Sequence, residues 1–147
     1  MVDVATFLGA DEDFARAEML EVLKFEMQLA NFSLPREERR NASRLYNPMR
    51  IKDLSKLDPN TPWLEYINRI LSAEIVQVSE DEMIIVNVQE YISKFSEYIQ
   101  GTSPRVQANY MLWRAAAASM KYLTDEARKI SLKFSQKLTG KSEETLR

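Results

Sequence analysis

Apolar residues recur at steps of three and four between Asp13 and Asn31, and this spacing constrains the fold more than any other feature of the sequence. A period close to 3.6 residues places such side chains on one face of an α-helix. No glycine or proline interrupts the run. We therefore expect an amphipathic helix that packs on a core. The residues expected in its buried stripe are Leu20, Leu23, Met27 and Ala30.

Start and stop signals predict helices along most of the remaining chain. Only three glycines and five prolines occur among 147 residues, and this composition favours helix. Serine or threonine before proline is typical of a helix start, whereas glycine or Asp-Pro is typical of a stop. We expect a mainly α fold of about seven helical segments. Besides the first run, these are Ser33–Arg44, Ile51–Asp58, Thr61–Leu71, Tyr91–Gly101, Ser103–Leu123 and Thr124–Gly140.

One β-like stretch interrupts the helical pattern. Ile75–Val78 and Met83–Val86 are rich in β-branched residues and flank a polar turn, Ser79–Glu82. We therefore expect one small β-hairpin in which these two segments pair. No repeat, low-complexity segment or linker divides the chain, so residues 1–147 are expected to form a single helical segment.

The chain contains no histidine and no cysteine, which limits its chemistry. Histidine is the commonest general base and zinc ligand, and cysteine supplies thiolate nucleophiles and iron–sulfur ligands. Three scattered glycines cannot build a phosphate-binding loop. Carboxylate chemistry is not excluded by composition. We predict no catalytic, cofactor-binding or metal-binding residue in this chain.

Charged and aromatic clusters are interpreted as structural features. The net charge is −2 without a basic stripe, which argues against nucleic acid as a partner. Asp11–Asp13 precedes a helix, where negative charge is favourable, and Ser79–Glu82 lacks the spacing of a calcium loop. Glutamates interrupt the arginines of Arg36–Arg44, which predicts a solvated, salt-bridged face. We expect Trp63 and Trp113 to pack in the core.

Two N-glycosylation sequons bear on the cellular compartment. Asn31-Phe32-Ser33 and Asn41-Ala42-Ser43 both have a middle residue other than proline. Such triplets also arise by chance and carry no meaning in the cytosol. Because the two sequons lie on either side of a charged segment, they give an extracellular location the same weight as a cytosolic one, and no more. Asn31 and Asn41 are thus candidate glycosylation sites.

Several strings, in order along the chain, carry a family resemblance. The first group is Leu29–Ser33, Pro35–Asn41 and Leu45–Met49, and the later strings are Pro62–Asn68, Glu90–Ile92, Asn109–Arg114 and Phe134–Gly140. Together they resemble the neprilysin and endothelin-converting enzyme family, in which a helix ends in a glycosylatable Ala-Asn-x-Ser/Thr before a charged segment and Leu-Tyr-Asn-x-Met. The resemblance extends from about Glu18 to Glu144. Its specificity comes from several motifs at matching spacing.

The resemblance implies a type II membrane or secreted zinc metalloendopeptidase, whose two helical lobes enclose a chamber that admits peptides. This chain is similar to part of the smaller lobe, which holds no zinc. The family's His-Glu-x-x-His, Glu-x-x-x-Asp and Asn-Ala-Tyr/Phe motifs match no position here, so no catalytic residue is carried over. The implied cofactor is zinc in a parent protein, and the implied partners are the zinc lobe and peptide substrates. The implied location is extracellular or at the plasma membrane, and Asn31 matches a glycosylated type of position.

Three interpretations fit these residues. The leading one is a fragment of a neprilysin-like peptidase that helps to form the substrate-restricting chamber and is inactive alone. The second is a standalone helical scaffold or interaction protein, and the third is part of an inactive peptidase homologue. A fragment also accounts for the missing cysteines, because the family carries disulfide cysteines before this segment and soon after its final helix.

Overall fold

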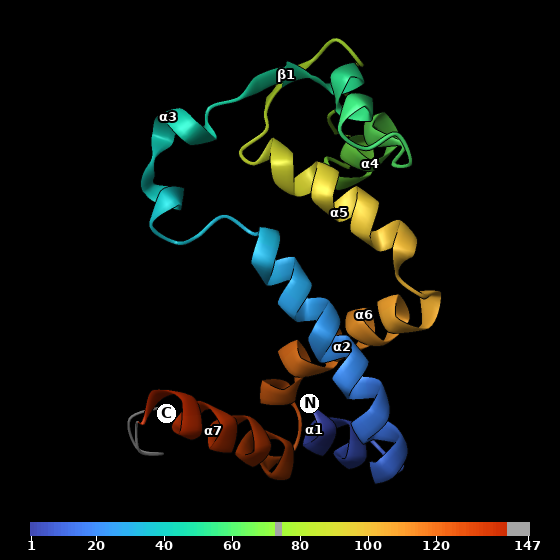
Figure 1. The fold of residues 1–147 in the computed structure, drawn as a ribbon, viewed down its shortest axis with the longest axis vertical. Coiled ribbons are helices and arrows are strands. Elements are labelled where there is room, and N and C mark those ends of the chain that lie inside the picture. Colours follow the sequence, from blue (N-terminus) through green and yellow to red (C-terminus); the bar gives the residue numbers. More distant parts are fainter. Residues whose placement is uncertain (73–74, 141–147) are drawn as a thin grey trace. The chain divides into compact units, whose positions relative to one another are not determined.

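A computed structural model describes residues 1–72 and 75–140 and is mainly helical, as predicted (Figure 1). The end of the family resemblance, residues 141–144, lies outside the described residues. The α-helices are α1 Val2–Phe7, α2 Glu12–Phe32, α3 Ala42–Leu45, α4 Trp63–Ile70, α5 Gln89–Gly101, α6 Pro104–Ser119 and α7 Asp125–Thr139. Short 3-10 helices span Glu38–Arg40, Ile51–Lys56 and Met120–Tyr122, and strands β1 and β2 span Pro48–Arg50 and Met83–Ile85.

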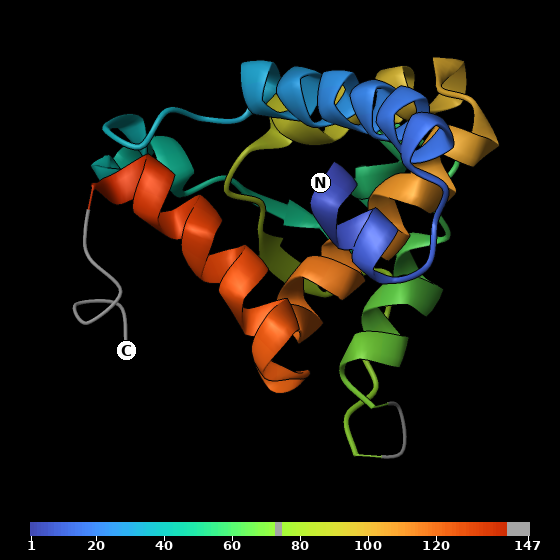
Figure 2. The same ribbon diagram turned by 90° about the horizontal axis from the view of Figure 1, so that it is seen from below.

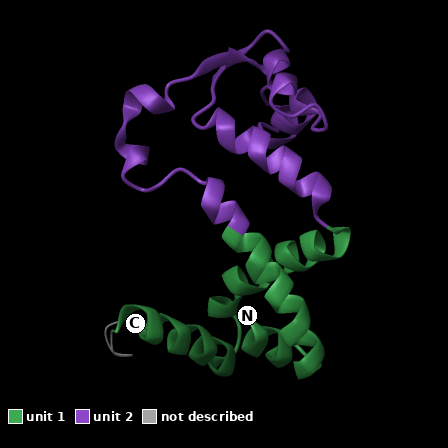
Figure 3. Cartoon of the chain, in the orientation of Figure 1, with its two compact units in different colours: residues 1–27, 103–147 green, residues 28–102 purple. Residues whose placement is uncertain are grey.

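The chain forms two compact units (Figure 3). Unit 1 comprises residues 1–27 and 103–147, and unit 2 comprises residues 28–102. Unit 1 therefore draws on two separate stretches of sequence, whereas unit 2 is continuous. The expectation that residues 1–147 form one segment of a larger lobe stays a prediction.

Unit 1 has a core where α1, α6 and α7 meet. Val4, Met120 and Ala127 are buried there, and Trp113 packs against them as predicted. Figure 2 shows α1 beside α6 and α7. The core thus joins the first and last parts of the described chain.

Helix α2 packs against α6 within unit 1. The Phe25 ring approaches the Tyr110 ring edge-on, with 4.9 Å between centroids. Glu18 accepts hydrogen bonds from Arg105 at 2.8 Å and from Asn109 at 2.6 Å. The buried residues of α2 in unit 1 are Ala15, Val22 and Phe25.

The prediction that the apolar stripe of α2 is buried was wrong. Leu20, Leu23 and Met27 are 51%, 42% and 58% exposed, and Ala30 is exposed as well. The helix carries apolar residues on two faces, and periodicity cannot decide which of them meets the core. The stripe is therefore an exposed apolar strip.

The ends of the last two helices match their predicted signals. The Ser103 hydroxyl oxygen accepts a hydrogen bond from the Val106 N–H at 3.3 Å, and Thr124 accepts one from the Ala127 N–H at 3.4 Å. Gly140 adopts a left-handed conformation, with φ of 68°, after α7. These are the cap geometries that serine, threonine and glycine favour.

The segment after α2 does not form the single polar helix predicted from Ser33 to Arg44. The Ser33 hydroxyl donates to the Leu29 carbonyl oxygen at 2.6 Å, so it closes α2 instead of starting a new helix. The 3-10 helix Glu38–Arg40 and the short α3 follow, with Asn41 as the cap of α3.

Unit 2 contains an antiparallel strand pair, but its partners differ from the predicted hairpin. Strand β2 pairs with β1, so that Met49 lies opposite Ile84, and no strand forms at Ile75–Val78. There, Val78 donates its N–H to Asn68 Oδ1 at 2.8 Å, and Asn68 Nδ2 donates to the Val78 carbonyl at 3.2 Å. The side-chain amide thus satisfies backbone groups that a partner strand would otherwise satisfy.

Asp58 is a buried carboxylate that joins α5 to the loop before α4. It accepts hydrogen bonds from the Ser96 hydroxyl at 2.6 Å, the Thr61 hydroxyl at 2.5 Å and the Asn60 N–H at 3.0 Å. The buried apolar residues of unit 2 are Leu29, Ile51, Leu54 and Val86.

Helix α4 buries only part of its apolar face. Trp63 is half-buried and donates its Nε1–H to the Asp58 carbonyl at 2.9 Å, so it packs within unit 2. Ile67 is also half-buried, but Ile70 and Leu71 at the end of the helix are exposed.

Candidate functional site

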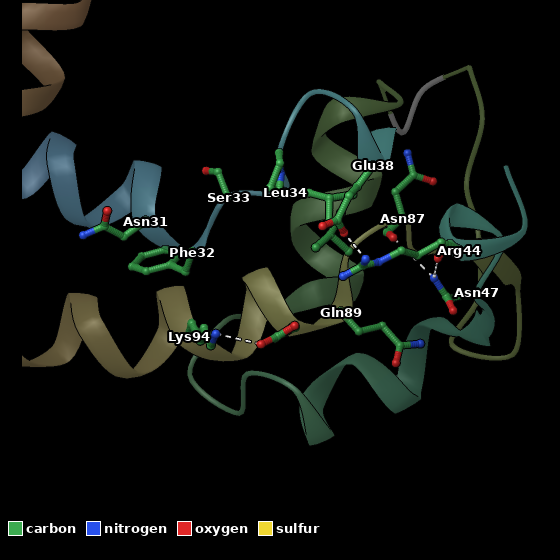
Figure 4. A pocket seen from close by; sticks show the side chains of 13 residues that line it. Asn31, Phe32, Ser33, Leu34, Glu38, Arg44, Asn47, Asn87, Gln89 and Lys94 are labelled. Carbon is green, nitrogen blue, oxygen red and sulfur yellow. Dashed lines mark hydrogen bonds and ion pairs between the residues drawn. The ribbon is translucent and has the colours of Figure 1, made fainter. Parts of the chain in front are cut away.

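A polar pocket lies in unit 2 beside the first sequon (Figure 4). Its volume is about 240 Å³. Sequence reasoning missed it, because its walls come from two segments that are separated by forty positions, and only the sequon marks its edge. The residues that line it are Asn31, Phe32, Ser33, Leu34, Pro35, Glu38, Arg44, Asn47, Asn87, Val88, Gln89, Glu90 and Lys94.

Two ion pairs contribute the charges of the polar pocket. Arg44 pairs with Glu38, which confirms a salt bridge within the arginine cluster, and Lys94 pairs with Glu90 at 2.7 Å. The hydrogen bond and charge of Lys94 lower the pKa of Glu90, and the charge of Arg44 lowers it further. A carboxylate held ionised at neutral pH is poorly suited to donate a proton. The pocket thus offers paired charges and amides for binding.

Both sequon asparagines are exposed. Asn31 lies in the last turn of α2, and its Nδ2 donates to Gln28 Oε1 at 3.3 Å. Asn41 caps α3, with its Oδ1 accepting the Arg44 N–H at 3.2 Å. Whether either asparagine carries a glycan stays a prediction.

The two acidic clusters have structural partners, as interpreted from the sequence. Asp11 Oδ1 accepts the Phe14 N–H at 3.0 Å at the start of α2. Asp81 pairs with Lys52 at 2.6 Å and with Arg50 at 3.4 Å. The hydrogen bond and charge of Lys52, and then the charge of Arg50, lower the pKa of Asp81. These contacts hold the turn before β2 next to β1.

An apolar groove of about 600 Å³ lies in unit 1, between α1, α2, α6 and α7. Leu23 from the exposed strip of α2 and Phe134 of α7 both line it, and both are exposed. The sequence analysis did not predict this groove, because it assigned Leu23 to the buried face. The lining residues are Met1, Asp3, Val4, Leu23, Glu26, Trp113, Ala117, Met120, Ile130, Ser131, Lys133, Phe134, Ser135 and Lys137.

The donor groups of this chain do not fit the zinc site that the resemblance implies. The sequence holds no histidine or cysteine, and no three acidic side chains within residues 1–72 and 75–140 lie close enough to hold a metal ion. Zinc sites are built mainly from histidine and cysteine, with carboxylates as additional ligands. In the same part of the chain, no helix is both long and apolar enough to cross a bilayer.

Comparison with known proteins places these features in a family context. The sequence model described as Peptidase family M13 matches residues 1–147. Neprilysin-2 of Drosophila melanogaster is 41% identical over 147 residues, which are 100% of this chain and 19% of that protein. Endothelin-converting enzyme 1 of Bos taurus is 32% identical over 141 residues, 95% of this chain and 18% of that protein. The chain therefore spans less than a fifth of the length of these relatives.

Proposed function

This chain belongs to peptidase family M13, and we propose that it is a helical, non-catalytic part of a neprilysin-like zinc metalloendopeptidase. The match over the whole chain, with relatives named as a neprilysin and an endothelin-converting enzyme, supports the peptidase origin. The non-catalytic role is supported by the sequence, which has no histidine for a His-Glu-x-x-His zinc motif. Zinc would be held by another part of the parent protein.

The observation that carries this proposal is the exposed apolar surface of unit 1. Leu23 and Phe134 line the groove, and Leu20 and Met27 are exposed on the same face of α2 as Leu23, three and four positions away from it. Large contiguous apolar patches on a protein surface mark sites of interaction with other protein surfaces or ligands. We infer that another part of the parent polypeptide packs on this surface and removes it from water.

The proposed physical role is steric. Helices packed in this way would form part of a wall around the peptidase chamber, so that peptides reach the zinc site and folded proteins do not. The chain itself would contribute shape and not chemistry. Its partners in this role are the zinc lobe of the parent and peptide substrates.

An extracellular or plasma-membrane location is part of the same proposal. Two observations support it: both sequon asparagines are exposed, and Asn31 lies where the family resemblance implies a glycosylated position. Exposure is required of an asparagine that carries a bulky, hydrated glycan on the folded protein.

The test replaces two apolar groove residues in the complete parent peptidase with Leu23→Glu and Phe134→Glu. Burying two unpaired carboxylates against apolar surface costs several kcal/mol, so we expect at least a roughly tenfold loss of secreted, zinc-dependent peptidase activity. Met111→Glu is the matched control, because Met111 lies on α6, is 70% exposed and lies outside the groove. It should retain most activity.

Two results would contradict the proposal. Full activity of the double variant would show that nothing packs on the groove. Zinc-dependent peptide hydrolysis by purified residues 1–147, abolished by a chelator, would overturn the non-catalytic role.

A further inference from the structure

A second pocket, which we name the aromatic pocket, lies between the end of α2 and α5 within unit 2. Its volume is about 420 Å³, within the range of small-molecule sites, about 300–1,000 Å³. The residues that line it are Gln28, Phe32, Lys94, Glu97, Tyr98 and Gly101. The Phe32 and Tyr98 rings meet edge-on, with 5.9 Å between centroids, and both side chains are half-buried. The pocket thus combines an aromatic surface with amide and charged groups.

Asn31 lines the polar pocket and is connected to the aromatic pocket through Gln28. Its Nδ2 donates to Gln28 Oε1, and Gln28 lines the aromatic pocket. Gln28, Asn31 and Phe32 are neighbours on the surface of α2, because residues three and four apart share a helix face. Figure 4 shows Asn31 at one end of the polar pocket, far from Arg44 and Asn47 at the other.

Glycosylation of Asn31 would leave this geometry intact. In that reaction Asn31 Nδ2 bonds to C1 of a lipid-linked oligosaccharide donor, the lipid diphosphate leaves, and the amide loses one proton. The amide keeps its second N–H, which can still donate to Gln28 Oε1. The attached sugar then starts at the edge of the aromatic pocket.

We propose that the first N-acetylglucosamine on Asn31 binds in the aromatic pocket, so that the glycan is a covalent ligand of the Phe32–Tyr98 surface. The C–H face of a pyranose ring is attracted to the negative face of an aromatic ring. Its hydroxyl and acetamido groups meet Lys94 and Glu97 at the rim. This inference rests on the proposed extracellular location, since it requires glycosylation.

The experiment uses the complete natural protein, secreted from a eukaryotic host in which mannose trimming is blocked. Glycopeptide mass spectrometry first measures occupancy of Asn31, and an unoccupied Asn31 overturns the glycosylation proposal and this inference together. Endoglycosidase H is then added to the native protein, where it cleaves the glycan between its two core N-acetylglucosamine residues. A stacked first sugar should slow this cleavage roughly threefold to tenfold relative to protein whose aromatic surface is removed.

Two variants distinguish docking of the first sugar in the aromatic pocket from steric hindrance of the endoglycosidase by the surrounding protein. Tyr98→Leu removes the aromatic face while keeping an apolar helix former, and Glu97→Ala removes an exposed rim group if Tyr98→Leu fails to fold. Both should accelerate cleavage at Asn31. Gln89→Ala, in the polar pocket, is the matched control and should leave the rate unchanged. If Asn31 is glycosylated but neither Tyr98→Leu nor Glu97→Ala changes the rate at which its glycan is cleaved, the docking proposal is overturned. The glycosylation proposal then stands.

Discussion

Asp58 shows how a single buried carboxylate organises unit 2. Its side chain is 7% exposed, yet its oxygens accept hydrogen bonds from two hydroxyls and one backbone N–H. Its backbone carbonyl accepts the Trp63 Nε1–H. A buried polar group with all these partners stabilises one arrangement of its loop, because leaving any partner unsatisfied is costly.

We expect Asp58→Asn to destabilise unit 2 by about 1–3 kcal/mol. The new amide nitrogen would face donors from Ser96, Thr61 or Asn60, where an acceptor is needed. Urea unfolding followed by circular dichroism measures the change. Asp53→Asn is the control, because Asp53 is more exposed than Asp58 and pairs with the exposed Lys56, so its loss should change stability less. Equal effects of the two substitutions would contradict this account.

The same carboxylate predicts a pH dependence of stability. Burial raises the pKa of Asp58, but hydrogen bonds from Ser96, Thr61 and Asn60 outweigh burial and leave it below its ordinary value of 3.8. A carboxylate with a lowered pKa stabilises the fold above its unfolded pKa, and this contribution is lost as pH falls through the folded pKa. The Tm difference between wild type and Asp58→Asn should therefore be largest near neutral pH.

Thermal melts between pH 7 and pH 2.5 test that dependence. The Tm difference should narrow below about pH 4, because the protonated Asp58 then resembles the amide. A difference that stays constant down to pH 2.5 would show that the ionised form of Asp58 contributes nothing.

At the level of elements, the segment before β2 is held by a side chain instead of by a strand. Asn68 on α4 accepts from and donates to the backbone of Val78. The turn beyond it is tied to β1 by Asp81, which pairs with Lys52 and Arg50. Together these contacts hold β2 beside β1 and away from Ile75–Val78.

Asn68→Ala should therefore expose the Val78 amide. Loss of both hydrogen bonds is expected to speed hydrogen exchange at Val78 by roughly fivefold to a hundredfold, because each bond contributes about 0.5–1.5 kcal/mol. Amide exchange by NMR or mass spectrometry measures this. Ser79→Ala changes the neighbouring side chain and serves as the control. Unchanged protection of Val78 in Asn68→Ala would indicate that another contact holds the segment.

On the scale of the whole molecule, unit 1 has an apolar groove lined in part by the exposed side chains of Leu23 and Phe134. We expect purified residues 1–147 to bind a hydrophobic fluorescent dye and to self-associate as concentration rises. Leu23→Glu with Phe134→Glu should lower dye fluorescence at least about twofold, and Met111→Glu should lower it less. Dye fluorescence and sedimentation velocity check both points. A monomer that binds no dye would contradict this view of the groove.

Residue patterns predicted the helical class and located the two sequons, but they did not predict the pockets. The caps at Ser103, Thr124 and Gly140 were predictable, since each depends on groups within one turn of the chain. The polar pocket and the apolar groove were not, because each combines segments that are far apart in sequence. Sequons mark where a glycan attaches, whereas the surface it contacts depends on packing.

The sequence by itself determined the mainly α class, the caps of the last two helices and the family, because these depend on local spacing and on motifs in order. Only the tertiary structure decided which face of α2 is buried and which segment pairs with Met83–Ile85. Helix α2 has apolar residues on two faces, and two segments could have paired with that strand. Long-range contacts chose between these alternatives, since the packing of Phe25 on Tyr110 and the hydrogen bonds of Asn68 outweigh weak local preferences.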